Sequence, residues 1–159
     1  KNRDKKTAKK NDVVYTPNHI AKILIENYLN DIVEEGDTIL DPCKGNGAFY
    51  DNYPKKCKKL YCEISEGKDF YEFNEPIDHI CSNPPYSHFT KFLEQSISFL
   101  INNFNLTPVR VKFMEEDGWY ITKIHLFDLK KWFGRQNYIV WEKRKEKPLT
   151  QFTWGKYKN

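Results

Sequence analysis

Two carboxylates at the ends of apolar runs, with a glycine turn between them, could together bind a nucleoside. The stretch "DPCKGNG" places Asp41 at the end of one short apolar run and follows it with Gly45 and Gly47. Glycines in such a turn let a ligand approach the backbone closely, because they carry no side chain. Glu63 ends the next run, where a carboxylate can accept hydrogen bonds from both hydroxyls of a ribose. We interpret these residues as one nucleoside-cofactor site, although two glycines alone would equally suit a structural turn before a helix.

The spacing around the glycines argues against two phosphate-binding motifs. A P-loop would carry Lys-Ser or Lys-Thr at the start of the following helix, and a dinucleotide fingerprint would carry a third glycine. Here the residues after Gly47 are "AFY". We therefore expect a cofactor that lacks a pyrophosphate.

A third apolar run ends in the motif "SNPPY", which contains Asn83, Pro84, Pro85 and Tyr86. Pro85 has a fixed φ and biases Pro84 toward an extended conformation, so the motif presents the Pro84 carbonyl instead of pairing it in a sheet. Taken by itself, the motif could be an ordinary turn or a proline-rich ligand. Its position after an apolar strand, downstream of a glycine turn and a strand-end acid, favours a functional site.

Apolar periodicity predicts the elements that must position these residues. Strands are expected at 38–40, 58–63, 77–82, 97–101, 119–127 and 137–144, and helices at 16–31, from near residue 48, at 87–96 and at 107–118. Thr16 is expected to cap the first helix, with Pro17 at its first helical position. Because helices or turns separate the early strands, we predict an α/β fold with a mainly parallel sheet, and the last two strands form an antiparallel pair at its edge.

In chain order, "YTP", "DPCKGNGAF", Glu63, "KDF" and "SNPPY" resemble the S-adenosylmethionine-dependent amino-methyltransferases. They are most similar to the DNA adenine N6-methyltransferases in which the cofactor motif precedes the catalytic motif. The resemblance covers residues 13–143 and implies a Rossmann-like methyltransferase fold. Only "ISEGK" separates Glu63 from Asp69, so the region of the third strand is expected to be shortened.

The resemblance implies a catalytic role for Asn83, Pro84 and Tyr86. The exocyclic amine of adenine is a poor nucleophile, because its lone pair is delocalised into the ring. The side-chain oxygen of Asn83 and the backbone carbonyl of Pro84 could each accept a hydrogen bond from one N–H group of this amine. Tyr86, beside Pro85, offers a stacking face to an extruded base. The methyl group leaves a sulfonium cation, so positioning and polarisation lower the barrier without a strong base.

The resemblance also implies S-adenosylmethionine as the cofactor. The residues implied to bind it are Tyr15, Thr16, Pro17, Asp41, Pro42, Gly45, Gly47, Glu63, Asp69, Phe70 and Asn83. Asp69 would accept the adenine amine of the cofactor and Phe70 would pack on its ring, whereas the alternative is a loop aspartate beside a core phenylalanine. Trp132 and Phe133 would present an aromatic face to the target base, or would instead pack on their own hairpin.

Basic residues are concentrated at the two ends of the chain. Residues 1–10 carry six Lys/Arg against one acidic residue, and residues 142–159 carry six against two, whereas residues 11–141 have a net charge of −5. We interpret residues 1–12 as a basic disordered arm, 13–143 as one methyltransferase domain and 144–159 as a basic C-terminal tail. Basic ends suit a polyanionic partner, although a solvated tail is the alternative.

These features together predict methyl transfer to the N6 amine of adenine in DNA, with base flipping. The open alternatives are an N-methyltransferase for RNA adenine or guanine, a protein glutamine methyltransferase, and a non-catalytic nucleic-acid-binding subunit. No separate target recognition domain is expected. The protein could then read a few bases through its loops and tails, depend on a partner chain or homodimer for target recognition, or prefer single strands or RNA. We expect no membrane segment, a cytoplasmic location and no metal, since the cysteines and histidines lack metal-ligand spacing.

Overall fold

The computed structural model describes residues 15–85, 98–102, 106–128 and 136–157. The strands are β1 (Thr38–Asp41), β2 (Lys58–Tyr61), β3 (His79–Ser82), β4 (Ser98–Asn102), β5 (Trp119–Asp128), β6 (Gln136–Lys143) and β7 (Gln151–Lys156). The α-helices are α1 (Asn18–Leu24), which continues as a π-helical turn over Ile25–Leu29, and α3 (Pro108–Glu116). Within these residues, no helix has the length and apolar character that crossing a bilayer requires.

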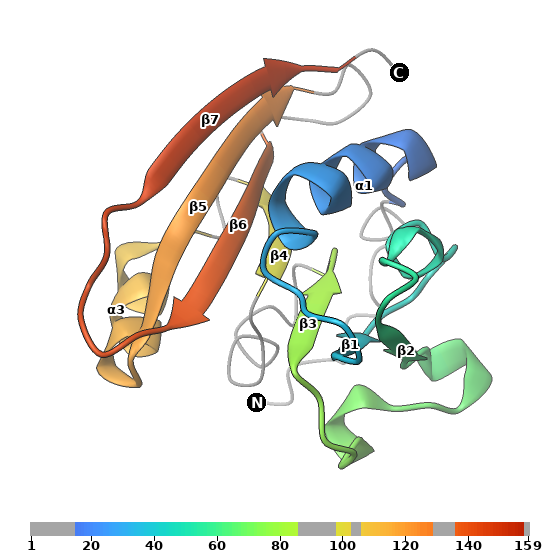
Figure 1. The fold of residues 1–159 in the computed structure, drawn as a ribbon. Helices are drawn as coiled ribbons and strands as arrows, with labels where there is room; N and C mark the ends of the chain where they lie inside the picture. Colours follow the sequence, from blue (N-terminus) through green and yellow to red (C-terminus); the bar gives the residue numbers. More distant parts are fainter. Residues whose placement is uncertain (1–14, 86–97, 103–105, 129–135, 158–159) are drawn as a thin grey trace, which may run out of the picture.

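The strands form one sheet in the order β2-β1-β3-β4-β6-β5-β7 (Figure 1). Strands β2, β1, β3 and β4 are parallel, whereas β6 runs antiparallel to both of its neighbours. This arrangement confirms the expected α/β fold with a mainly parallel sheet and an antiparallel β5–β6 pair. That pair is not at the edge of the sheet as expected, because the additional strand β7 lies beyond β5 and runs parallel to it. The strand order and directions are consistent with the expected Rossmann-like methyltransferase fold.

The sheet has no third strand beside β2, as its short connection predicted. Residues 62–78, all of which the structure describes, contain the 3-10 turns Ile64–Glu66 and Phe70–Glu72 and an isolated bridge between Glu63 and Lys68. Gly67 has a φ of 75°, which reverses the chain at the end of the first of these turns. Strand β2 therefore lies at one edge of the sheet, and the turns that follow it are free to border a ligand site.

The two faces of the sheet bury different side chains of the same strands. In β1, Ile39 packs with the α1 side chains, while Leu40 packs in a second cluster that includes Met114 of α3. Figure 1 shows the two helices on opposite sides of the sheet. This alternation follows from the period of two along a strand.

The start of α1 differs from the prediction in its capping residue. The N-cap is Pro17, whose extended backbone carbonyl accepts hydrogen bonds from the amides of Ile20 and Ala21 at 3.0 and 3.1 Å. Thr16 is therefore not the cap, and its hydroxyl accepts a hydrogen bond from Asn83 instead. By contrast, Thr107 caps α3 through its side chain.

Two further expected helices have different outcomes. The helix expected from near Ala48 is only a 3-10 turn, Tyr50–Asn52, because the chain folds straight back toward β2. The helix expected at 87–96 lies outside the described residues.

The expected C-terminal tail contains a strand. Residues 151–156 form β7, which pairs in parallel with the segment Lys123–Asp128 of β5. The buried His125 of β5 contributes to this attachment, because its Nδ1 lies 2.7 Å from Thr153 Oγ1 and its Nε2 lies 2.6 Å from Tyr157 Oη. The charge count hid this strand, since the lysines lie on both sides of the alternating segment "QFTWG".

Candidate functional site

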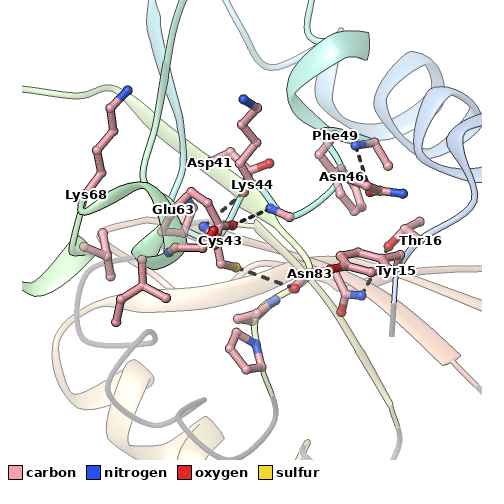
Figure 2. A pocket seen from close by; sticks show the side chains of 18 of the residues that line it. Tyr15, Thr16, Asp41, Cys43, Lys44, Asn46, Phe49, Glu63, Lys68 and Asn83 are labelled. Carbon is pink, nitrogen blue, oxygen red and sulfur yellow. Dashed lines mark hydrogen bonds between the residues drawn. The ribbon is translucent and has the colours of Figure 1, made fainter. Parts of the chain in front are cut away.

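A cavity of about 500 Å³ lies where the carboxyl ends of β1, β2 and β3 meet (Figure 2). Parallel strands bring their carboxyl ends to one edge of a sheet, which is where ligands bind in folds of this class. The predicted residues that line the cavity are Tyr15, Thr16, Asp41, Pro42, Gly45, Glu63, Asp69, Phe70, Asn83, Pro84 and Pro85. Segments distant in sequence are thus brought together at one site.

Other predicted site residues lie elsewhere. Pro17 and Gly47 are not among the lining residues. Pro17 begins α1, and Gly47, with a φ of 85°, lies where an added Cβ would come within 3.0 Å of the Asp51 carboxylate. Their roles in the structure are therefore those of helix start and turn. Tyr86, Trp132 and Phe133 lie outside the described residues.

Asp41 is buried at the base of the cavity. Its Oδ1 accepts hydrogen bonds from the Ser82 hydroxyl at 2.7 Å and from the Cys43 amide at 3.3 Å. Burial raises the pKa of the Asp41 carboxyl to about 7, although both of these hydrogen bonds favour the ionised form. The carboxyl therefore changes its charge close to neutral pH.

This titration predicts that Asp41→Asn stabilises the protein more at pH 8 than at pH 5. A carboxyl with a raised pKa keeps its proton in the folded state between its unfolded value of 3.8 and about 7, so its contribution favours folding at low pH and is lost as pH rises through 7. An amide cannot ionise and escapes that loss. Urea unfolding of both proteins should show the advantage of the variant growing by about 3 kcal/mol from pH 5 to pH 8, because each pH unit between 5 and 7 costs the wild type about 1.4 kcal/mol. An advantage that is equal at the two pH values would contradict a raised pKa at Asp41.

Glu63 joins the end of β2 to the glycine turn. Its Oε2 accepts a hydrogen bond from the Gly45 amide at 2.8 Å, and its Oε1 accepts from the Ser65 amide and hydroxyl at 3.2 and 2.8 Å. Burial acts to raise the pKa of Glu63, but the hydrogen bonds from Ser65 and Gly45 outweigh it and the pKa is lowered. The carboxylate is thus held ionised and in one orientation at the cavity wall.

Asn83 follows β3 directly and is held at two points. Its Nδ2 donates a hydrogen bond to Thr16 Oγ1 at 3.2 Å, and its backbone carbonyl accepts one from Cys43 Sγ at 3.6 Å. The next residue, Pro84, is buried, and Pro85 is half-buried. The motif therefore leaves the sheet at the cavity and does not continue the strand.

Asp69 and Phe70 have structural roles as well as places on the cavity wall. The Asp69 carboxylate accepts a hydrogen bond from the Tyr71 amide at 3.0 Å and caps a 3-10 turn. Phe70 is buried in the hydrophobic cluster that also contains Leu40. The structural alternative thus holds for both residues, and their contact with a cofactor stays a prediction.

Sequence reasoning missed part of the wall. The further lining residues are Cys43, Lys44, Asn46, Ala48, Phe49, Ile64, Ser65, Lys68 and Tyr71. Ile64 is 76% exposed, and its position directly after Glu63 was the available signal that an apolar side chain borders the site. The ammonium groups of Lys44 and Lys68 lie 3.9 and 3.7 Å from the centre of the Tyr61 ring, in contacts that the sequence does not reveal.

The geometry is that of an organic ligand site. In the part of the chain that the structure describes, no three His, Cys, Asp or Glu side chains cluster as metal ligands do. The cavity combines apolar walls with two carboxylates, Asp41 and Glu63, at fixed positions. Such a site can surround a flat heterocycle and accept hydrogen bonds from hydroxyl or ammonium groups.

Comparison with known proteins supports the fold. No family model matches the sequence, and no curated protein matches it. A structure from Listeria monocytogenes, described as a class I S-adenosylmethionine-dependent methyltransferase, matches with a TM-score of 0.57 and 13% identity over 87% of this chain and 63% of that one. A modification subunit of a type I restriction enzyme, so described, from Vibrio vulnificus YJ016 matches with a TM-score of 0.61 and 12% identity over 94% and 48%.

A third structure, from Pyrococcus horikoshii, is described as the RNA methyltransferase PH1948. It matches with a TM-score of 0.51 and 20% identity, over 80% of this chain and 86% of that one. At these identities the likeness is one of fold. The chain spans less than two thirds of the length of the Listeria and Vibrio proteins.

Proposed function

We propose that the protein transfers a methyl group from S-adenosylmethionine to the exocyclic N6 amine of adenine in DNA. The observation that carries this proposal is the meeting of Asn83 and Pro84 with Asp41 and Glu63 in one cavity. Asn83 and Pro84 offer two acceptors that suit a planar amine. Asp41 and Glu63 offer carboxyl groups that suit a nucleoside cofactor. The cofactor, when bound, supplies an electrophilic methyl group.

The cavity residues offer the chemical groups that S-adenosylmethionine would need. Glu63 is ionised and oriented, so its carboxylate can accept hydrogen bonds from ribose hydroxyls. Phe70 and Ile64 supply apolar surface for the adenine ring, and Asp69 supplies an acceptor for its amine. Tyr15 and Thr16 border the remaining end, where the methionine portion would lie.

The target amine would be held by the motif after β3. The Asn83 side-chain oxygen and the Pro84 carbonyl can each accept a hydrogen bond from one N–H group of this amine and so draw its nitrogen toward tetrahedral geometry. Positioned acceptors of this kind lower a barrier without removing a proton before the transfer. Tyr86 would stack on the flipped base, and Trp132 and Phe133 would approach it from the loop between β5 and β6.

DNA is the substrate that we favour, because "YTP" and the Asp-Pro opening of the glycine turn resemble the DNA enzymes most. The Vibrio structure, described as a modification subunit of a restriction enzyme, supports this choice and also a partner chain or second copy for target recognition. RNA is the second candidate, since the Pyrococcus structure, described as an RNA methyltransferase, is matched over 86% of its length.

A tritiated methyl transfer assay with DNA, RNA and protein substrates tests the proposal. Digestion of the labelled product to nucleosides should yield N6-methyl-2′-deoxyadenosine from DNA. Label in RNA or in glutamine would replace the proposed substrate with one of the alternatives. Calorimetry should show S-adenosylmethionine binding, and cofactor binding without transfer to any substrate would favour a non-catalytic subunit.

A further inference from the structure

The hydroxyl of Thr16 reaches the side-chain amide of the residue proposed to hold the target amine. Asn83 Nδ2 donates a hydrogen bond to Thr16 Oγ1 at 3.2 Å, across 67 positions of sequence. Thr16 is 3% exposed, so its hydroxyl lies in a fixed environment at the start of α1. Figure 2 shows the amide nitrogen of Asn83 turned toward Thr16.

The orientation of this amide decides what Asn83 can offer. One branch of the amide is an acceptor oxygen and the other is an NH₂ donor, and the two branches have nearly the same shape. The target amine donates hydrogen bonds through its N–H groups, so only the oxygen branch of the amide can accept from it. If the amide were rotated by half a turn, the NH₂ group of Asn83 would face the NH₂ group of the target base. The acceptor oxygen would then point away from the target.

The backbone of Asn83 is held separately from its side chain. Cys43 Sγ lies 3.6 Å from the Asn83 carbonyl oxygen and 3.0 Å from the Ser82 hydroxyl, which in turn donates to Asp41 at 2.7 Å. These contacts fix the main chain at the end of β3 relative to the glycine turn. They leave the rotation of the Asn83 amide about its own side chain to be set by contacts such as the one with Thr16.

We propose that Thr16 is a positioning residue that orients the Asn83 amide by holding its nitrogen toward α1, so that the oxygen is the branch directed to a substrate amine. This inference rests on the proposed function, because it assigns Thr16 an effect on the transfer step in addition to its place on the cofactor wall. It also explains why the hydroxyl is not used to cap α1, where the Pro17 carbonyl accepts the first helical amides.

Thr16→Val tests the proposal, because valine keeps the shape and removes the hydroxyl. At saturating cofactor and substrate, the single-turnover rate should fall about tenfold, the loss expected for one positioning hydrogen bond. Thr16→Ser restores the hydroxyl and should recover most of the rate. Thr122→Val, which removes a buried hydroxyl of β5 that bonds to Glu142, is the matched control and should leave the rate unchanged.

If Thr16 only contacted the cofactor, Thr16→Val would weaken cofactor affinity but leave the rate at saturation unchanged, and that result would overturn the inference. A loss of rate that Thr16→Ser fails to recover would also overturn it. Absence of transfer by the wild-type protein would instead overturn the proposed function.

The side-chain amide of Asn83 gives a second readout, which needs no activity. Its NH₂ signals can be assigned in a ¹⁵N spectrum of the unliganded protein by their loss in Asn83→Asp. Exchange of these protons with solvent should be faster in Thr16→Val than in the wild type, Thr16→Ser or Thr122→Val. Equal exchange in all four proteins would show that Thr16 does not hold the amide.

Discussion

Replacing Asn83 by alanine is expected to lower the rate of methyl transfer about 10²- to 10³-fold, the range found when one preorganised hydrogen-bonding group is removed from a reaction site. The substitution deletes the side-chain oxygen that is proposed to accept a hydrogen bond from the target amine, and it leaves the Pro84 carbonyl as the other proposed acceptor. Cofactor affinity should change less than about threefold, because the Glu63 carboxylate and the apolar wall are untouched. Single-turnover transfer of tritiated methyl groups and calorimetry with S-adenosylmethionine measure the two effects separately.

Asn52→Ala is a suitable control for this experiment. The Asn52 side chain also donates a hydrogen bond, to the Ala48 carbonyl at 2.8 Å, but it does not line the cavity. The Asn52→Ala substitution should therefore leave the transfer rate at saturating cofactor unchanged. If Asn83→Ala lost the cofactor and kept its rate at saturation, the division between a cofactor wall and an amine-binding motif would be wrong.

Replacing Glu63 by alanine should weaken S-adenosylmethionine binding about 10- to 100-fold, since hydrogen bonds to a charged group contribute roughly 1.5–3 kcal/mol. Two effects combine in this loss. The proposed ribose acceptors disappear, and the Gly45 amide loses the partner that holds the glycine turn in place. Glu63→Gln keeps one acceptor oxygen and should bind with intermediate affinity. Calorimetric titration of the three proteins checks the order.

Glu66→Ala is the matched control for Glu63→Ala. Glu66 lies in the same 3-10 turn and accepts a hydrogen bond from Tyr61 Oη at 2.9 Å, but it does not line the cavity. Its replacement should leave cofactor affinity unchanged. Equal losses for Glu63→Ala and Glu66→Ala would show that the turn as a whole, and no particular carboxylate, supports binding.

Much of the fold could be predicted because its signals are local. The apolar runs that become β1, β2 and β3 are short and end in residues that stop a strand, such as the glycine turn after Asp41 and Pro84 after Asn83. The absence of a third strand also followed from counting, since five residues between Glu63 and Asp69 cannot hold a helix and a strand. Strand β7 was missed, because the lysines on both sides of "QFTWG" indicated a solvated tail, and its pairing with β5 is a contact between distant segments.

Residue types and spacing alone specify which chemical groups are available at the strand ends: a carboxylate before a glycine turn, a second carboxylate, and an asparagine followed by two prolines. These follow from residue type and spacing along one run of chain. Only the tertiary structure decided which groups meet. It buries Asp41, which raises the pKa of that carboxyl to about 7, and it brings Thr16, just before α1, to Asn83. Burial and contacts between distant segments depend on how the strands are ordered in the sheet, and local spacing does not encode that order.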